Sequence, residues 1–123
     1  MSSVPTPAAP ATAVAADHAG IETVLSRYRQ AFTALDANAA RAVWPAVDAR
    51  ALGRAFDQLV EQQLDFQRCD ITVNSAQATA ACGGRARYVP KVGSRSVRDE
   101  PRQWTFSLQK VDGQWLIERV ISR

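Results

Sequence analysis

Two cysteines are the residues whose chemistry is easiest to interpret, and they end the stretch CDITVNSAQATAAC, residues 69–82. Two thiols and the single histidine, His18, are too few for a structural zinc site, which needs four ligands. A catalytic thiolate would need a base nearby, and His18 is distant from both cysteines along the chain. Two possibilities remain: a disulfide between Cys69 and Cys82, or two buried thiols that pack as small apolar side chains.

The residues between the cysteines favour the disulfide. Polar and apolar residues alternate on both sides of a turn, which is typical of an antiparallel hairpin. A turn centred on residues 75–76 places Cys69 directly opposite Cys82, where cross-strand neighbours lie close enough for a disulfide. Because such a bond persists in an oxidising compartment, we expect an extracytoplasmic protein, periplasmic or at the cell surface, as part of a tethered or secreted chain.

Basic side chains form a second group of candidates. Residues 85–123 carry nine basic and four acidic side chains, whereas residues 1–84 carry six and eight. A cluster of one sign attracts an anionic ligand or partner, although a solvated basic face would have the same composition. Nucleic acid fits less well, because the sequence lacks an aromatic-interleaved basic strand or a recognition helix. The candidate basic surface consists of Arg85, Arg87, Lys91, Arg95, Arg98 and Arg102.

A third candidate is a pocket beside the predicted second strand, residues 77–89. One face of this strand carries small residues, including Ala80, Gly84 and Ala86, which leave room between the sheet and the helices. Aromatic side chains could line a small-ligand cavity there or simply fill the space. The candidate pocket residues are Tyr28, Trp44, Phe56, Tyr88, Trp104, Phe106 and Arg119. We expect no metal site and no cofactor.

The orientation of Arg119 decides whether the aromatic side chains line an open cavity or fill the space. With a turn at Asp112–Gly113, strict alternation places Arg119 opposite Phe106 on the inward face. A buried unpaired charge is costly, so we expect a bulge near residues 118–119 that turns Val120 inward instead. The alternative is that Arg119 lies in a real, partly solvated cavity and binds an anionic ligand.

The first half of the chain is helical in pattern. Apolar residues from Ile21 to Leu35 recur on one helical face. Asp36 or Asn38 can cap a short second helix, which must end near residue 44 because a proline follows, and Asp48 can cap a third.

After residue 60 the apolar period changes from 3.6 to 2, with a phase slip near residues 67–68 that suggests a bulge. Four strands follow, the third at residues 102–110 and the last after the Asp112–Gly113 turn. The sequence therefore predicts an α+β fold: three N-terminal helices packed on a curved antiparallel sheet of about four strands.

The first sixteen residues differ in composition from the rest. They are rich in alanine and proline and carry no charge or aromatic ring. Prolines interrupt the apolar stretch that a secretory signal needs, and no apolar run approaches the ~20 residues of a membrane span. We therefore predict a disordered linker or tail over residues 1–16 and one domain over residues 17–123.

Three helices followed by a sheet that ends in DGQWLIERV resemble the nuclear transport factor 2-like superfamily, a cone-shaped α+β fold that includes ketosteroid isomerases and scytalone dehydratases. A closer resemblance is to domains near the C-terminal end of some bacterial membrane-anchored serine/threonine kinases, and to lone secreted-type proteins, in which a Pro/Ala-rich linker precedes the domain. Its signals are RYRQAFTALDANAARAVWPAVDARALGRAF, the two cysteines, RYVPKVGSR and WTFSLQK. No kinase activity follows, because the kinase part is not in this sequence.

The superfamily's enzymes place acid/base residues inside the cone. An isomerase-like site would need a tyrosine on the first helix, an acid just past it and an acid on the third strand. Tyr28 and Asp36 could supply the first two, but the inward positions of the predicted third strand are Trp104, Phe106 and Leu108.

Because this carboxylate is missing, we expect a non-catalytic extracytoplasmic module that senses a small or anionic ligand or binds a protein partner. It could form a homodimer, and it could be the accessory domain of a larger signalling protein. Two alternatives stay open: a small lyase or isomerase that uses the cone cavity, and an anion or nucleic-acid binder that uses the arginines.

Overall fold

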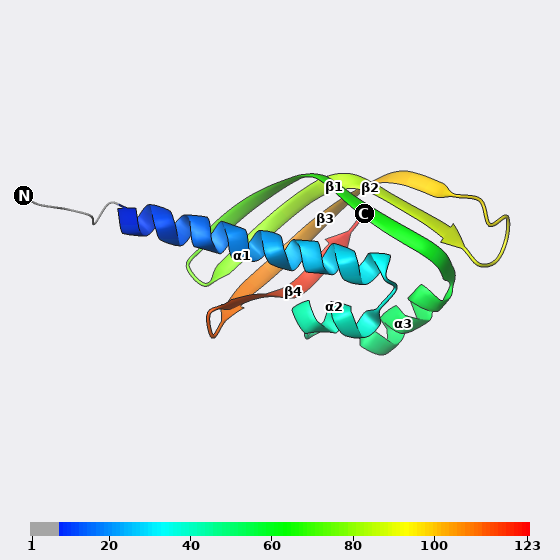
Figure 1. Cartoon of the computed structure of the whole chain (residues 1–123), viewed down its shortest axis with the longest axis horizontal. Coiled ribbons are helices and arrows are strands. Elements are labelled where there is room, and N and C mark those ends of the chain that lie inside the picture. Colours follow the sequence, from blue (N-terminus) through cyan, green and yellow to red (C-terminus); the bar gives the residue numbers. More distant parts are fainter. Residues whose placement is uncertain (1–7) are drawn as a thin grey trace, which may run out of the picture.

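Three helices precede four strands in the computed structural model, which describes residues 8–123, with side chains from residue 13 on. The helices are α1 (Ala8–Thr33), α2 (Ala37–Val43) and α3 (Ala49–Asp57). The strands are β1 (Leu59–Asn74), β2 (Gln77–Pro90), β3 (Arg98–Val111) and β4 (Gln114–Ser122), and they form one antiparallel sheet in sequence order. The strands arch over α1 (Figure 1). This architecture confirms the predicted α+β fold.

The helix boundaries follow from local chemistry. The Asp36 carboxylate accepts a hydrogen bond from the backbone N–H of Ala39, and the Asp48 carboxylate accepts one from Ala51, each at 3.0 Å, so each aspartate is an N-cap. The second helix ends at Val43, as expected from Pro45.

The long first helix begins earlier than expected. It starts at Ala8, so residues 8–16 of the predicted disordered tail are helical. Alanine has the highest helix propensity of all residues, and this segment is rich in it. Residues 1–7 of the predicted tail lie outside the described residues, and the domain boundary at residue 17 stays a prediction. None of the described helices is apolar enough over sufficient length to cross a bilayer.

Both predicted bulges are present in the sheet. The pairing of β1 with β2 shifts between Phe66 and Arg68. On the last hairpin Leu108 pairs with Ile117 and Ser107 pairs with Arg119, which leaves Glu118 as the extra residue.

The second bulge settles the orientation of Arg119. Val120 lies opposite Phe106 and packs against the core, while Arg119 is exposed. The alternative of an inward Arg119 is therefore wrong, because the extra residue at position 118 reverses the phase of β4.

The core lies between α1 and the concave face of the sheet. The inward stripe of α1 contributes Ile21, Leu25 and Tyr28, and the sheet contributes Phe106 and Ile117 among others, all at most 4% exposed. Burying this apolar surface is the main stabilising contribution to such a fold.

Candidate functional site

Aromatic rings meet at the centre of the concave face. Tyr28 stacks on Phe32 with ring centroids 4.2 Å apart and meets the edge of Phe106 at 5.0 Å. Phe66 lies 4.7 Å from Trp104. These rings occupy the space that the small residues of β2 leave open, so the room predicted there is largely filled by side chains.

Five of the seven candidate pocket residues belong to this aromatic cluster. Tyr28, Trp104 and Phe106 are buried in it, Trp44 lies 6.3 Å from Tyr28, and Phe56 joins through Phe32 at 5.1 Å. The other two do not. Arg119 is exposed, for the reason given above, and Tyr88 lines a separate cavity.

The structure adds a carboxylate that the sequence analysis did not place on the third strand. Strand β3 begins at Arg98 rather than at residue 102, and Glu100 pairs with Ala86 while Arg102 pairs with Gly84. Glu100 and Arg102 alternate with exposed neighbours and continue the inward series of Trp104 and Phe106. Glu100 therefore lies on the concave face, where the isomerase-like pattern needs an acid.

Pro101 explains why this extension was missed. A proline inside a predicted strand normally argues against that strand, because it lacks a backbone N–H. Strand β4, however, ends at Ser122, which lies opposite Trp104. At Pro101, β3 therefore has no neighbouring strand on the β4 side, and the missing N–H of the proline costs no hydrogen bond there. The alternation of Glu100 and Arg102 with Trp104 was the available signal.

Arg102 connects the carboxylate to the aromatic cluster. Its guanidinium donates to the Glu100 carboxylate, and the two side chains are 27% and 43% exposed, so solvent and ligands can reach them. Burial raises the pKa of the Tyr28 hydroxyl well above its usual range, while the positive charge of Arg102 lowers it to a smaller extent. Tyr28 therefore stays protonated, and its hydroxyl makes no hydrogen bond within the described part of the chain.

Asp36 does not join this group. Its carboxylate is exposed and is engaged as the N-cap of α2. The expectation that Asp36 could be the second acid of an isomerase-like site is therefore wrong, because helix capping orients its side chain toward the backbone of α2.

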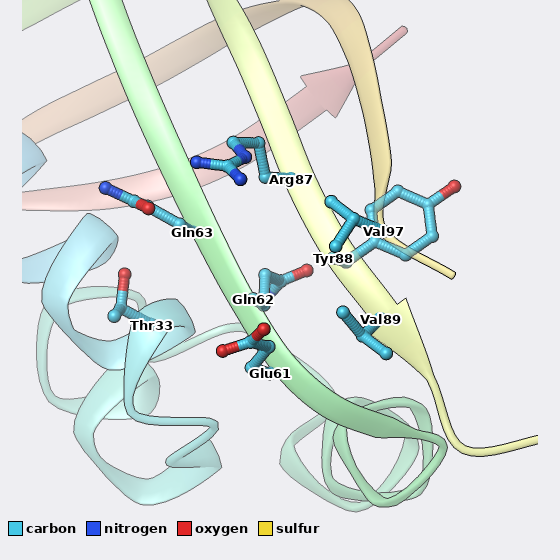
Figure 2. Close-up of a pocket in the computed structure, with 8 residues that line it drawn as sticks. All are labelled: Thr33, Glu61, Gln62, Gln63, Arg87, Tyr88, Val89 and Val97. Carbon is cyan, nitrogen blue, oxygen red and sulfur yellow. The ribbon is translucent and has the colours of Figure 1, made fainter. Parts of the chain in front are cut away.

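A cavity of about 300 Å³, called the second cavity to separate it from the aromatic cluster, lies beside the first residues of β1 and the last residues of β2. Glu61, Arg87, Tyr88 and Val97 are among the residues that line it, and the consecutive side chains of Arg87 and Tyr88 point in opposite directions (Figure 2). Its volume is at the lower limit for a small-ligand pocket.

The six residues of the candidate basic surface do not form a single patch. Arg85 and Arg87 approach the Asp99 carboxylate to 2.7 and 3.8 Å, and Arg102 pairs with Glu100, so half of the group is ion-paired. The other three, Lys91, Arg95 and Arg98, are exposed in and beside the β2–β3 loop.

The cysteine prediction is confirmed. Cys69 and Cys82 are direct partners on β1 and β2, with Cα atoms 4.0 Å apart, and they form a disulfide. Among the described residues, no three histidine, cysteine, aspartate or glutamate side chains gather in a way that could hold a metal ion.

No protein-family model and no curated protein matches this sequence. Solved structures do match. A nuclear transport factor 2-like superfamily protein from Salmonella enterica has a TM-score of 0.77 at 12% identity, covering 91% of this chain and 92% of the other. The hexachlorocyclohexane dehydrochlorinase LinA-type3 from Novosphingobium barchaimii has a TM-score of 0.76 at 11% identity, covering 88% and 86%. A protein from Streptomyces avermitilis, assigned to the dehydratases of the same family, has a TM-score of 0.75 at 10% identity, covering 86% and 94%.

These matches correct the prediction that the chain is not an enzyme. Two of the three solved structures carry enzyme names. The ground for the prediction was the missing carboxylate on the third strand, and Glu100 supplies one. Identities of this size establish the architecture and no more, and on that basis the chain has the nuclear transport factor 2-like fold.

Proposed function

We propose that the chain is a small lyase or isomerase that removes a proton from a carbon next to a carbonyl group of a small substrate. The observation that carries the proposal is the Glu100–Arg102 ion pair on the concave face of β3, the face on which the buried side chain of Tyr28 packs against Phe106. The positive charge of Arg102 acts on the Tyr28 phenol. A carboxylate, a cation and a protonated phenol together are a sufficient set of groups for this chemistry.

Each group has a distinct role in the proposed reaction. The Glu100 carboxylate accepts the proton from the carbon, and the electron pair of the broken C–H bond moves into the enolate. The Tyr28 hydroxyl donates a hydrogen bond to the enolate oxygen, where negative charge develops. Arg102 orients Glu100 through their hydrogen bond and adds positive charge to the site.

The two named reaction classes differ only in the second step. In a lyase the enolate electron pair forms a carbon–carbon double bond, and the leaving group departs from the β-carbon with the electron pair of its bond. A hydroxyl group takes up the proton now on Glu100 and leaves as water. In an isomerase Glu100 returns the proton to another carbon. The names dehydrochlorinase and dehydratase both denote an elimination, which supports the lyase of the two.

We also propose that the protein works in an oxidising compartment. The Cys69–Cys82 disulfide supports this, because such bonds persist where thiols are not kept reduced. A homodimeric state and attachment to a larger signalling protein stay predictions from the sequence.

The test uses 4-hydroxy-2-butanone, a small β-hydroxy ketone, with the purified chain. Wild-type protein should catalyse loss of water to methyl vinyl ketone, followed by absorbance, and exchange of the proton at C3 in D₂O, followed by NMR. Glu100→Gln should lower both rates by about 100-fold or more, because it removes the base.

Glu61→Gln is the matched control, since Glu61 is an exposed carboxylate in the second cavity. It should keep the wild-type rates. Equal activity of wild type and Glu100→Gln, or loss of activity in Glu61→Gln alone, would contradict the assignment of Glu100. Absence of both reactions in the wild-type chain would count against this substrate class.

A further inference from the structure

Four residues form a single row across the convex face of the sheet. Arg68 on β1 pairs with Gly83 on β2, and Gly83 pairs with Gln103 on β3. Backbone hydrogen bonds of 2.9 Å in both directions then join Gln103 to Arg123. The row therefore has an arginine at each end and a glycine between them.

The glycine creates a hollow in this row. Residues around Gly83 and Gly84, including Arg68, Arg102, Gln103 and Arg123, line an open hollow of about 660 Å³. The Arg68 guanidinium lies over Gly83, with Nε 3.8 Å from where a Cβ would stand. Arg68 thus extends toward the middle of the hollow.

The charge of this hollow is positive. Three arginines and no acidic residue are among the described residues that line it. Arg102 pairs with Glu100, but Arg68 and Arg123 make no ion pair with any described side chain within 4.0 Å. Two guanidinium groups are therefore available to an external anion.

We propose that this row binds a small ligand with two oxyanion groups, such as a diphosphate. The ends of the row are three strand spacings apart, about 14 Å between backbones, and both arginine side chains can reach inward over that span. A guanidinium binds a phosphate or sulfate oxyanion by two parallel hydrogen bonds, and the Gln103 amide between them adds a donor.

The surrounding charges favour a small ligand over a nucleic acid. Toward the β2–β3 loop, the next positions on the convex face carry Asp65 opposite Arg85. Asp99 follows, and its carboxylate is ion-paired with both Arg85 and Arg87. A nucleic acid needs basic side chains along an extended path of phosphates. Here acidic residues interrupt that path on the side toward the β2–β3 loop.

The experiment is a titration of the whole chain with pyrophosphate at low salt, followed by two-dimensional ¹H–¹⁵N NMR and calorimetry. The amide signals of Gly83 and Gln103 should shift and saturate. Arg68→Gln and Arg123→Gln should each weaken binding by about tenfold or more, the effect expected for a lost charge-assisted hydrogen bond.

Two further variants separate a built site from general attraction. Gly83→Val keeps the charge but fills the hollow, so it should also weaken binding by about tenfold. The three atoms nearest to an added Cβ all belong to the flexible Arg68 side chain. Arg54→Gln removes an exposed charge on α3 and should change affinity less than about twofold.

Three outcomes would overturn the proposal: no saturable shift in the wild-type chain, wild-type affinity in Gly83→Val, or equal losses in Arg68→Gln and Arg54→Gln. Tighter binding of a single-stranded oligonucleotide than of pyrophosphate would replace the small ligand by a polyanion. The residues of the row and its test variants, Arg68, Gly83 and Arg123, lie on the face opposite Glu100 and have no role in the proposed reaction, so failure of this proposal leaves the proposed function untouched.

Discussion

Cys69 and Cys82 lie directly opposite each other on β1 and β2, one on each side of the Ser75–Ala76 turn, and a disulfide joins them. Cys82 is buried in the core cluster, and Cys69 packs against it. The bond thus closes a hairpin whose residues pair without interruption from the turn to Arg68–Gly83, the last pair before the β1 bulge.

Replacing both cysteines by alanine should lower the free energy of unfolding by about 3 kcal/mol, since the bond closes a loop between residues 13 apart in sequence. Urea unfolding with and without a reductant measures this. The mass of the non-reduced wild type should be lower than that of the reduced form by two hydrogen atoms. Two alkylatable thiols in protein from an oxidising host would contradict the pairing.

Gly84 and Gly83 should differ sharply in their tolerance of alanine. A Cβ on Gly84 would lie 1.8 Å from the backbone oxygen of Asp65, at the β1 bulge, so Gly84→Ala forces the strands apart. We expect a loss of roughly 3 kcal/mol in the free energy of unfolding.

Gly83→Ala is the control, because the nearest atom would be the Arg68 guanidinium at 3.8 Å. Its stability should stay within about 1 kcal/mol of wild type. Similar thermal midpoints for the two variants would mean that β1 does not approach β2 this closely at the bulge.

Tyr28→Phe should change how stability depends on alkaline pH. Burial raises the pKa of Tyr28 in the folded protein, so the unfolded chain releases this proton first, near its ordinary pKa of about 10. The stability that Tyr28 contributes is therefore complete below that pH and is lost as pH rises toward the folded-state pKa. The urea concentration at the midpoint of unfolding should fall more in wild type than in Tyr28→Phe between about pH 8 and pH 11, a range around the ordinary pKa of about 10. Parallel curves would show that the phenol is accessible to water.

Asp17 should make the opposite contribution, at acid pH. Its carboxylate accepts hydrogen bonds from Lys110 Nζ at 3.0 Å and Trp115 Nε1 at 3.3 Å, which joins α1 to the β3–β4 hairpin. The hydrogen bond from Lys110 is the main reason that the pKa of Asp17 is lowered.

The stability from Asp17 is thus present above the unfolded-state pKa of about 3.9 and is lost as pH falls through the lower folded-state value. Asp17→Asn should lose less stability than wild type between pH 7 and pH 3, a range around that pKa, in chemical unfolding. Asp70→Asn, at an exposed position on β1, serves as the comparison and should follow the wild-type curve.

Much of the fold could be predicted because its signals are local. Asp36 and Asp48 cap helices through their own neighbours, and the Asp112–Gly113 turn and the alternation on either side of Ser75 determine two hairpins. The disulfide followed from the hairpin around Ser75, because a hairpin turn of known position sets the register of the pairs that follow it.

The candidate site could not be predicted in the same way, because it depends on where separate strands end. Whether Glu100 belongs to β3 depends on β4, which stops short of Pro101 and removes the penalty for a proline there. The aromatic rings that raise the pKa of Tyr28 come from helix and strand positions far apart in sequence.

The arginine row depends on three registers at once. Arg68 and Arg123 are 55 positions apart in sequence (123 − 68). The register of the β1–β2 hairpin places Arg68 opposite Gly83, and the bulge at Glu118 places Arg123 opposite Gln103, so that both lie on the convex face of the sheet. A bulge reverses the phase of all residues that follow it. Local patterns thus determined the elements of this protein, and the pairing between strands decided which charged side chains share a face.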